Sequence, residues 1–123
     1  GLGAAAPVIL HGYPARMAAL ARLDPADARV AERFEIFAGG VELANGFGEL
    51  TDAAEQERRF EADLRAIRDA GGRREIDRDF LAALAHGLPP ATGVAMGFDR
   101  LVMLATDAKR IDDVLWLPVA CPD

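Results

Sequence analysis

Two glutamates, one on each side of a glycine pair, have the residue type and spacing of a possible cation site. Glu35 and Glu42 flank Gly39-Gly40, and a two-residue turn there would place them diagonally on one face of a hairpin, about 7–8 Å apart at Cβ or closer. Neighbouring carboxylates repel each other unless a cation lies between them, and Mg²⁺ prefers one or two carboxylates with phosphate oxygens. The pair therefore points to a Mg²⁺–nucleotide site. The residues alone favour the alternative, in which one glutamate pairs with an arginine and the other meets solvent.

A strand that runs directly into a helix carries the second signal. Small residues occupy alternate positions from Gly93 to Gly97, and a strand face without large side chains lets a flat ligand or another backbone approach. Arg100 follows in the first helical turn, where a guanidinium and free N–H groups suit a phosphate. Close helix–sheet packing, with Arg100 paired to Asp99 or Glu42, fits the spacing equally well. The glycine spacing is not that of a dinucleotide-binding fingerprint.

A polar, glycine-rich segment from Asn45 to Asp52 follows the second strand of the hairpin. A carboxylate in such a segment, that of Glu49, could hold an amino group. The alternative is a turn in which Glu49 and Asp52 serve the N-terminus of the next helix. His11 and His86 have no acid or nucleophile at a catalytic spacing, so we interpret both as structural or surface residues.

Short apolar runs predict the strands that position these residues. Val8-Ile9-Leu10, bounded by prolines, predicts a buried strand. The runs 33–38 and 41–45 predict a hairpin with Ala38 opposite Val41, and the run 91–98 predicts a later strand. Residues 15–23 are compatible with a short helix or with an extended loop containing one turn.

Three helices are predicted between and after the strands. The first begins at Thr51 or Asp52, has Glu55 at the capping-box position and ends before Gly71-Gly72. Its buried face is Phe60, Leu64 and Ile67, and its many charged residues are interpreted as a solvated face. The second helix spans 77–85 with Phe80, Leu81 and Leu84 inward, and the third starts at Asp99. The tail from Ile111 to Pro118 supplies the apolar anchors Ile111, Val114, Leu115 and Leu117.

Length and composition limit the class of protein. The 123 residues are 51% apolar, which predicts one small α+β domain with a real core and antiparallel strands flanked by helices. No apolar run reaches the ~20 residues of a membrane span, and residues 1–6 lack the basic start of a signal peptide. A net charge of −6 with Lys109 as the sole lysine argues against general polyanion binding. Cys121 is a lone cysteine, which fits a reducing cytoplasmic setting.

Three segments in this order resemble the C-terminal half of the catalytic domain of class II lysyl-tRNA synthetases. They are 33–37, 42–52 and 93–104, of which the last resembles class II motif 3. The resemblance runs from about Pro7 to Pro118. It implies part of the class II antiparallel sheet flanked by helices, in a single partial catalytic domain spanning residues 1–123.

The resemblance implies a nucleotide side of the site. Glu42 and Leu43 would contact ATP, and Glu42 and Glu35 would lie near Mg²⁺. Gly97 would let the adenine or ribose approach the strand, and Arg100 would bind the γ-phosphate as the catalytic cation. Catalysis in this family is mostly positioning and charge neutralisation, so that the lack of a side-chain nucleophile agrees with it.

The resemblance also implies an amino-acid side. Glu49 would bind the side-chain ammonium of lysine or β-lysine, and Asn45 and Phe47 would line that pocket. Strict alternation places Asn45 on the face opposite Glu42. We therefore expect the strand to bulge or twist between residues 44 and 46, where Gly46 permits it.

Within the family the chain most resembles the bacterial paralogues that attach β-lysine to elongation factor P. The segments 30–35 and 42–47 look like that subfamily. Ala95 stands where tRNA synthetases usually have glycine, and Ala18-Ala19-Leu20 where they tend to have Ser-Pro-Leu. The Ala95 methyl would narrow the amino-acid pocket, and a change of that size discriminates by about 1–3 kcal/mol.

The chain departs from the family where motifs 1 and 2 are expected. Arg33-Phe34-Glu35 and Arg59-Phe60-Glu61 reproduce only the spacing of the motif 2 Arg-x-Glu. The chain therefore looks like the C-terminal part of a longer, homodimeric enzyme, and we expect it to be inactive alone. Three hypotheses follow: a ligase acting on elongation factor P, a synthetase charging tRNA-Lys, or a synthetase-like binding module without catalysis. None of them involves a membrane.

Overall fold

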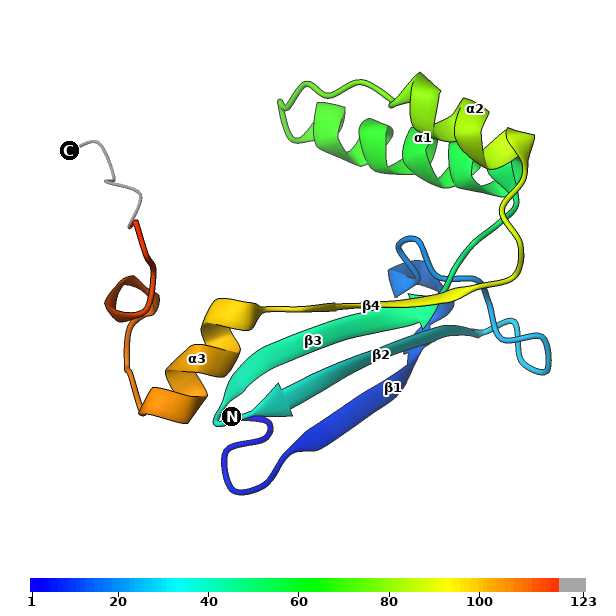
Figure 1. The fold of residues 1–123 in the computed structure, drawn as a ribbon. Coiled ribbons are helices and arrows are strands. Elements are labelled where there is room, and N and C mark those ends of the chain that lie inside the picture. Colours follow the sequence, from blue (N-terminus) through cyan, green and yellow to red (C-terminus); the bar gives the residue numbers. More distant parts are fainter. Residues whose placement is uncertain (118–123) are drawn as a thin grey trace. The chain divides into compact units, whose positions relative to one another are not determined.

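The computed structural model describes residues 1–117, so that Pro118 and Cys121 lie outside the described residues. Four strands, β1 (Val8–Pro14), β2 (Val30–Ala38), β3 (Val41–Gly48) and β4 (Thr92–Met96), form one sheet in the order β1-β2-β3-β4 (Figure 1). The helices are α1 (Ala53–Asp69), α2 (Arg78–His86) and α3 (Phe98–Thr106), with 3₁₀ turns at Ala15–Met17 and Ile111–Asp113. The predicted α+β architecture is confirmed.

The chain divides into two compact units, each built from segments that are distant in the sequence. Unit 1 comprises residues 1–11, 34–46 and 94 onwards, and unit 2 comprises residues 12–33 and 47–93. Unit 1 therefore holds the hairpin turn and α3, whereas unit 2 holds α1, α2 and the loop that follows β1. That residues 1–123 form a single partial catalytic domain stays a prediction.

The hairpin between β2 and β3 turns at Gly39-Gly40, as predicted. Both glycines have positive φ angles, 60° and 81°, which is the geometry of the two-residue turns that match the twist of paired strands. Gly39 also lies against α3, because a Cβ at this position would clash with Cδ2 of Leu104. Glycine at position 39 thus permits the positive φ angle and leaves room for the Leu104 side chain.

The segment after β1 is a loop rather than a longer helix. A single 3₁₀ turn covers Ala15–Met17, and two isolated antiparallel bridges follow, Ala21 with Glu49 and Leu23 with Ala31. Of the two alternatives for residues 15–23, the extended loop with one turn is confirmed. This loop contributes Ala18 and Ala21 to a small buried cluster of unit 2, which Ala31 of β2 completes.

The helices α1 and α2 each begin at an aspartate cap. The side chain of Asp52 accepts a hydrogen bond from the Glu55 amide at 3.0 Å, and that of Asp77 accepts one from the Phe80 amide at 2.9 Å. Asp52, not Thr51, is therefore the cap of α1. The helices contact each other through the predicted apolar faces, with the rings of Phe60 and Phe80 5.9 Å apart.

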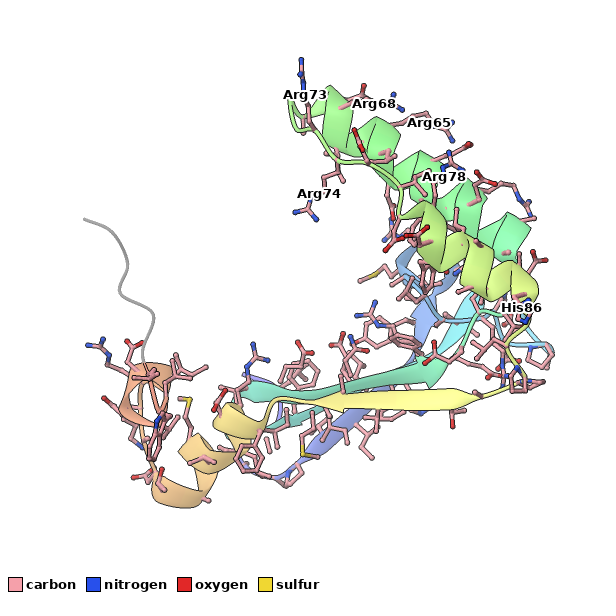
Figure 2. The ribbon with its side chains drawn as sticks, turned by 45° about the horizontal axis from the view of Figure 1, so that its top comes forward. Arg65, Arg68, Arg73, Arg74, Arg78 and His86 are labelled. Atoms are coloured by element: carbon pink, nitrogen blue, oxygen red, sulfur yellow. The ribbon has the colours of Figure 1, made fainter. Side chains whose placement is uncertain are left out.

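The solvated face predicted for α1 is confirmed only in part, because Glu55, Glu57 and Arg59 are half-buried and the other charged side chains of the helix are exposed. Figure 2 shows Arg65, Arg68 and Arg73 extending outward from the far end of the helical hairpin, and all three are exposed. Arg58 pairs with Glu55 at 2.7 Å and Arg78 pairs with Glu57. Exposed pairs of this kind stabilise a fold by only about 0–1 kcal/mol. No helix within residues 1–117 combines the length and hydrophobicity needed to cross a membrane.

The predicted core is smaller than the composition indicates. Among the described residues of unit 1, the buried hydrophobic side chain is that of Ala44, whereas Phe98 is 71% exposed. Val8, Ile9 and Leu10 form a strand but are exposed, so that their predicted burial is wrong. The physical reason is that β1 and β4 are the edge strands of the sheet, and no described segment covers their apolar side chains.

The predicted apolar anchors of the tail are also partly wrong. Ile111 and Leu117 are exposed, whereas Val114 and Leu115 are half-buried. A 3₁₀ turn at Ile111–Asp113 interrupts the segment, and its short length lets only part of the apolar set face α3. The two histidines, His11 and His86, are exposed, in agreement with their interpretation as surface residues.

Candidate functional site

Arg100 lies in the first turn of α3, immediately after β4, and reaches back to β3. Its Nη1 donates a hydrogen bond to the main-chain carbonyl of Glu42 at 2.7 Å. Within residues 1–117 it forms no ion pair with the carboxylates of Asp99 or Glu42, which was the alternative reading of its position. The guanidinium keeps further N–H groups for an anion, since it carries five donors in all.

Gly97 brings the end of β4 close to β3 and to Arg100. Its amide donates to the carbonyl of Leu43 at 2.8 Å. A Cβ at position 97 would lie 3.3 Å from Cδ of Arg100, so that the aliphatic part of Arg100 lies over this glycine. The small residue therefore accommodates the arginine side chain, and its contact with an adenine or ribose stays a prediction.

Asn45 carries an unsatisfied polar atom. Its Oδ1 is buried and has no hydrogen-bond partner within residues 1–117. The pairing of Leu43 with Gly97 places Asn45 opposite Ala95 on the neighbouring strand, because opposite residues step together along antiparallel strands. A buried acceptor without a partner costs about 1–3 kcal/mol, which a bound N–H donor would recover.

The bulge expected in β3 between residues 44 and 46 does not form. Burial alternates without interruption, with Ala44, Gly46 and Gly48 buried. The hydrogen bonds that join β3 to β4 at Leu43–Gly97 and at Glu49–Ala91 leave segments of equal length on the two strands, so that neither strand carries an extra residue. Strict alternation therefore holds, and Asn45 lies on the face of β3 opposite Glu42.

The two carboxylates predicted to lie near Mg²⁺, Glu35 and Glu42, are half-buried on the hairpin of unit 1. No group of three or more His, Cys, Asp or Glu residues within residues 1–117 is arranged to hold a metal ion. The donor chemistry of two glutamates nevertheless suits Mg²⁺ when phosphate oxygens complete its coordination. These residues therefore fit a metal that arrives with a nucleotide and not a metal held by protein alone.

In unit 2, the backbone of Glu49 pairs with a different segment on each side. Its amide donates to the carbonyl of Ala91 at 3.0 Å, and it pairs with Ala21 in an antiparallel bridge. A Cβ at Gly93 would lie 2.6 Å from Oε1 of Glu49, so that the carboxylate lies directly over this glycine. The cap of α1 is Asp52, and the carboxylate of Glu49 is directed to β4 instead.

Phe47, which the resemblance places in the amino-acid pocket, has a packing role in the structure. It is half-buried and packs against the cluster formed by Ala18, Ala21 and Ala31. Ala95, predicted to shape the same pocket, is exposed in unit 1. The ring of Phe47 thus supports the loop that pairs with Glu49, and any contact of Phe47 or Ala95 with a substrate stays a prediction.

Two residues of α1 have roles that the sequence reasoning missed. Gln56 is 1% exposed and its Nε2 has no hydrogen-bond partner in the described part of the chain. Arg59 donates to the carbonyls of Ala19 and Ala21. Gln56 lies one helical turn before Phe60, and extending the inward face by that turn would have found it. No local sequence pattern predicts the contacts of Arg59, because its partners lie about forty residues earlier in the chain.

Comparisons with known proteins identify the family of the chain. The family model described as tRNA synthetases class II (D, K and N) matches residues 3–120. The chain is 53% identical over 119 residues to the elongation factor P–(R)-beta-lysine ligase of Hamiltonella defensa subsp. Acyrthosiphon pisum (strain 5AT), covering 96% of this chain and 37% of the relative. It is 54% identical over 120 residues to the ligase of the same name from Proteus mirabilis (strain HI4320), again covering 96% and 37%. The chain therefore spans little more than a third of the length of these curated relatives.

Proposed function

The chain belongs to the class II tRNA synthetase family (D, K and N), and from that premise we propose that it is part of an ATP-dependent ligase. The ligase activates lysine or β-lysine as an adenylate and transfers it to a lysine of elongation factor P. Relatives that are 53–54% identical carry the name of that activity. We propose further that the whole enzyme is a cytoplasmic homodimer.

The observation that supports an amine substrate is the buried Oδ1 of Asn45, which has no hydrogen-bond partner within residues 1–117. An acceptor in this state is stabilised when a ligand supplies an N–H group. Glu49 provides the charge that a side-chain ammonium requires, and its carboxylate lies over Gly93, which has no side chain of its own to fill that space. An ammonium and a carboxylate form a charge-assisted hydrogen bond, which is about twice as strong as a neutral one.

We assign binding of the nucleotide to Arg100 and to the hairpin formed by β2 and β3. Arg100 is anchored by the Glu42 carbonyl and would bind the γ-phosphate of ATP, with the positive end of the α3 dipole beside it. Leu43 and Gly97, hydrogen-bonded to each other, would border the nucleotide. Glu42 and Glu35 would hold the Mg²⁺ that accompanies the phosphates, and this ion supplies charge neutralisation to the leaving pyrophosphate.

The chemistry then requires placement of reactants more than reactive side chains. The substrate carboxylate attacks the α-phosphate, the bond to the β-phosphate oxygen breaks, and pyrophosphate leaves. The amine of the acceptor lysine next attacks the acyl carbon of the adenylate and AMP leaves. The resemblance assigns the amine to Glu49 and the phosphates to Arg100, and each residue would act by positioning and charge neutralisation.

Charging of tRNA-Lys is the second candidate. Ala95, whose methyl lies opposite Asn45, favours the protein acceptor because it narrows the space beside the sheet and alters which lysine isomer fits. A synthetase-like module that binds without catalysis is the third candidate. The three differ in the products that the full-length protein makes.

The test is pyrophosphate exchange by the full-length protein with lysine and with each β-lysine enantiomer, followed by transfer assays. We expect exchange with at least one of these amines, transfer to elongation factor P and no charging of tRNA-Lys. Glu49→Ala should abolish amine-dependent exchange, whereas Glu61→Ala, an exposed carboxylate of α1, should leave it unchanged. Normal exchange by Glu49→Ala would exclude Glu49 as the ammonium ligand, and acylated tRNA would favour the second candidate.

A further inference from the structure

Arg59 of α1 makes contacts that no catalytic role explains. Its Nη1 donates to the carbonyls of Ala19 and Ala21, at 3.1 and 2.7 Å, and its Nε donates to Oε1 of Glu55 at 2.9 Å. The side chain is only 18% exposed. A guanidinium placed in this way links the first turns of α1 to a loop that lies about forty residues earlier in the chain.

That loop is the neighbour of Glu49. The Leu50 amide donates to the carbonyl of Leu20 at 2.9 Å, and the Arg22 amide donates to the carbonyl of Gly48 at 2.8 Å. Ala21 and Glu49 are thus bridged as in an antiparallel sheet. Residues 20–22 behave as a short extra strand, and alternate carbonyls of an extended segment point to opposite edges.

The outer edge of this short strand is completed by arginine instead of by another strand. The carbonyls of Ala19 and Ala21 point away from Glu49 and are taken by Arg59. The carbonyl of Met17 is taken by Nη1 of Arg33 at 2.7 Å. Backbone carbonyls require hydrogen-bond partners, and the two arginines provide them along the edge of this short strand.

The backbone of the loop is held in an unfavourable conformation. Ala19 has a φ angle of 52°, a left-handed conformation that residues with a Cβ rarely adopt. The adjacent Ala18 and Ala21 are buried, which leaves little room for the loop to relax while it stays packed. A conformation of this kind persists only where the surrounding contacts hold it, and Arg59 supplies two of them.

We infer that Arg59 is a positioning residue that fixes the carboxylate of Glu49 by holding the 19–21 segment against the backbone of Glu49. The inference rests on the proposed function, since it takes Glu49 as the ligand of the substrate ammonium. In this inference Arg59 acts through the backbone of the 19–21 segment and not by contact with the amine or with ATP. The backbone of Glu49 is held by the 19–21 segment on one side and by Ala91 of the segment before β4 on the other. Removing the Arg59 contacts frees the 19–21 segment to move, which weakens binding of the amine and leaves binding of ATP unchanged.

The experiment uses the full-length enzyme and pyrophosphate exchange. Arg59→Met should raise KM for the amine substrate at least tenfold and change KM for ATP less than twofold. Arg59→Lys should give an intermediate rise, because an ammonium retains the charge and one carbonyl contact. The matched control is Arg58→Met, since Arg58 is 70% exposed and also pairs with Glu55 but forms no hydrogen bond with the loop within residues 1–117. Its KM values should stay within twofold of wild type.

A double-mutant cycle separates this inference from the proposed function. In a Glu49→Gln background, Arg59→Lys should raise KM for the amine by no more than twofold, because the charge that Arg59 positions is gone. Equal increases in both KM values, an unchanged amine KM, or a full additional increase on Glu49→Gln would overturn the inference. Should Arg59→Met fail to fold, the Arg59→Lys cycle decides alone. If Glu49→Gln itself leaves the amine KM unchanged, the proposed role of Glu49 is what fails.

Discussion

The carboxylate of Glu49 occupies the space that a side chain at position 93 would need, with 2.6 Å between Oε1 and an ideal Cβ on Gly93. The small residues of β4 are therefore not one uniform strip. Gly93 makes room for Glu49, Gly97 makes room for the aliphatic part of Arg100, and Ala95 faces Asn45. The two glycines are thus small for different neighbours, one directly after β3 and one on α3.

Gly93→Ala should weaken binding of the amine substrate more than it weakens the fold. The added methyl meets the end of a flexible side chain, so that Glu49 can rotate away and the free energy of unfolding should fall by less than about 1 kcal/mol. KM for the amine in pyrophosphate exchange should rise at least fivefold. Val94→Ala is the control, because Val94 is 62% exposed. An unchanged KM for Gly93→Ala would show that the position of this carboxylate does not matter for binding.

The two turn glycines should differ in their sensitivity to substitution. Gly39→Ala and Gly40→Ala each force a Cβ into the left-handed region, at a cost of about 1–2 kcal/mol. Only Gly39 would also clash, with Cδ2 of Leu104, whereas a Cβ at Gly40 meets nothing within 4 Å. Urea unfolding should therefore show a larger loss of stability for Gly39→Ala. Equal losses would mean that α3 does not pack on the turn.

Asp27 should titrate below its ordinary pKa of 3.8. Hydrogen bonds from the side chain and the backbone of Arg29 stabilise the carboxylate, so that the pKa of Asp27 is lowered, with Nη2 of Arg29 2.8 Å from Oδ2. A lowered folded-state pKa contributes stability above the unfolded value of 3.8 and loses it as the pH falls through the folded value. NMR titration should show this shift, and Arg29→Gln should return the pKa towards 3.8. Arg68→Gln, in a helix that does not contact Asp27, is the control.

Local patterns in the sequence were enough for the elements whose signals lie within a few residues. The glycine pair predicts the hairpin turn because only glycine readily adopts two successive positive φ angles. Asp52 and Asp77 predict helix starts because a cap bonds to an amide three residues away. The motif resemblance, read from three short segments, predicts the family to which the chain belongs.

Burial and long-range contacts could not be read in this way. Val8, Ile9 and Leu10 have the composition of a buried strand, but β1 lies at the edge of the sheet and its side chains are exposed. The lack of a bulge in β3 depends on its pairing with β4, and it separates Asn45 from Glu42. The contacts of Arg59 with the 19–21 segment join residues that no periodicity relates.

The sequence by itself thus determined the local structures, and it predicts which of their residues bind a nucleotide and an amine. Only the tertiary structure decided what holds each of them in place: Ala91, Ala21 and Gly93 around Glu49, and the Glu42 carbonyl for Arg100. The physical reason is that turns and caps are stabilised by hydrogen bonds between near neighbours in the chain. The contacts around these side chains form only when distant strands and helices come together.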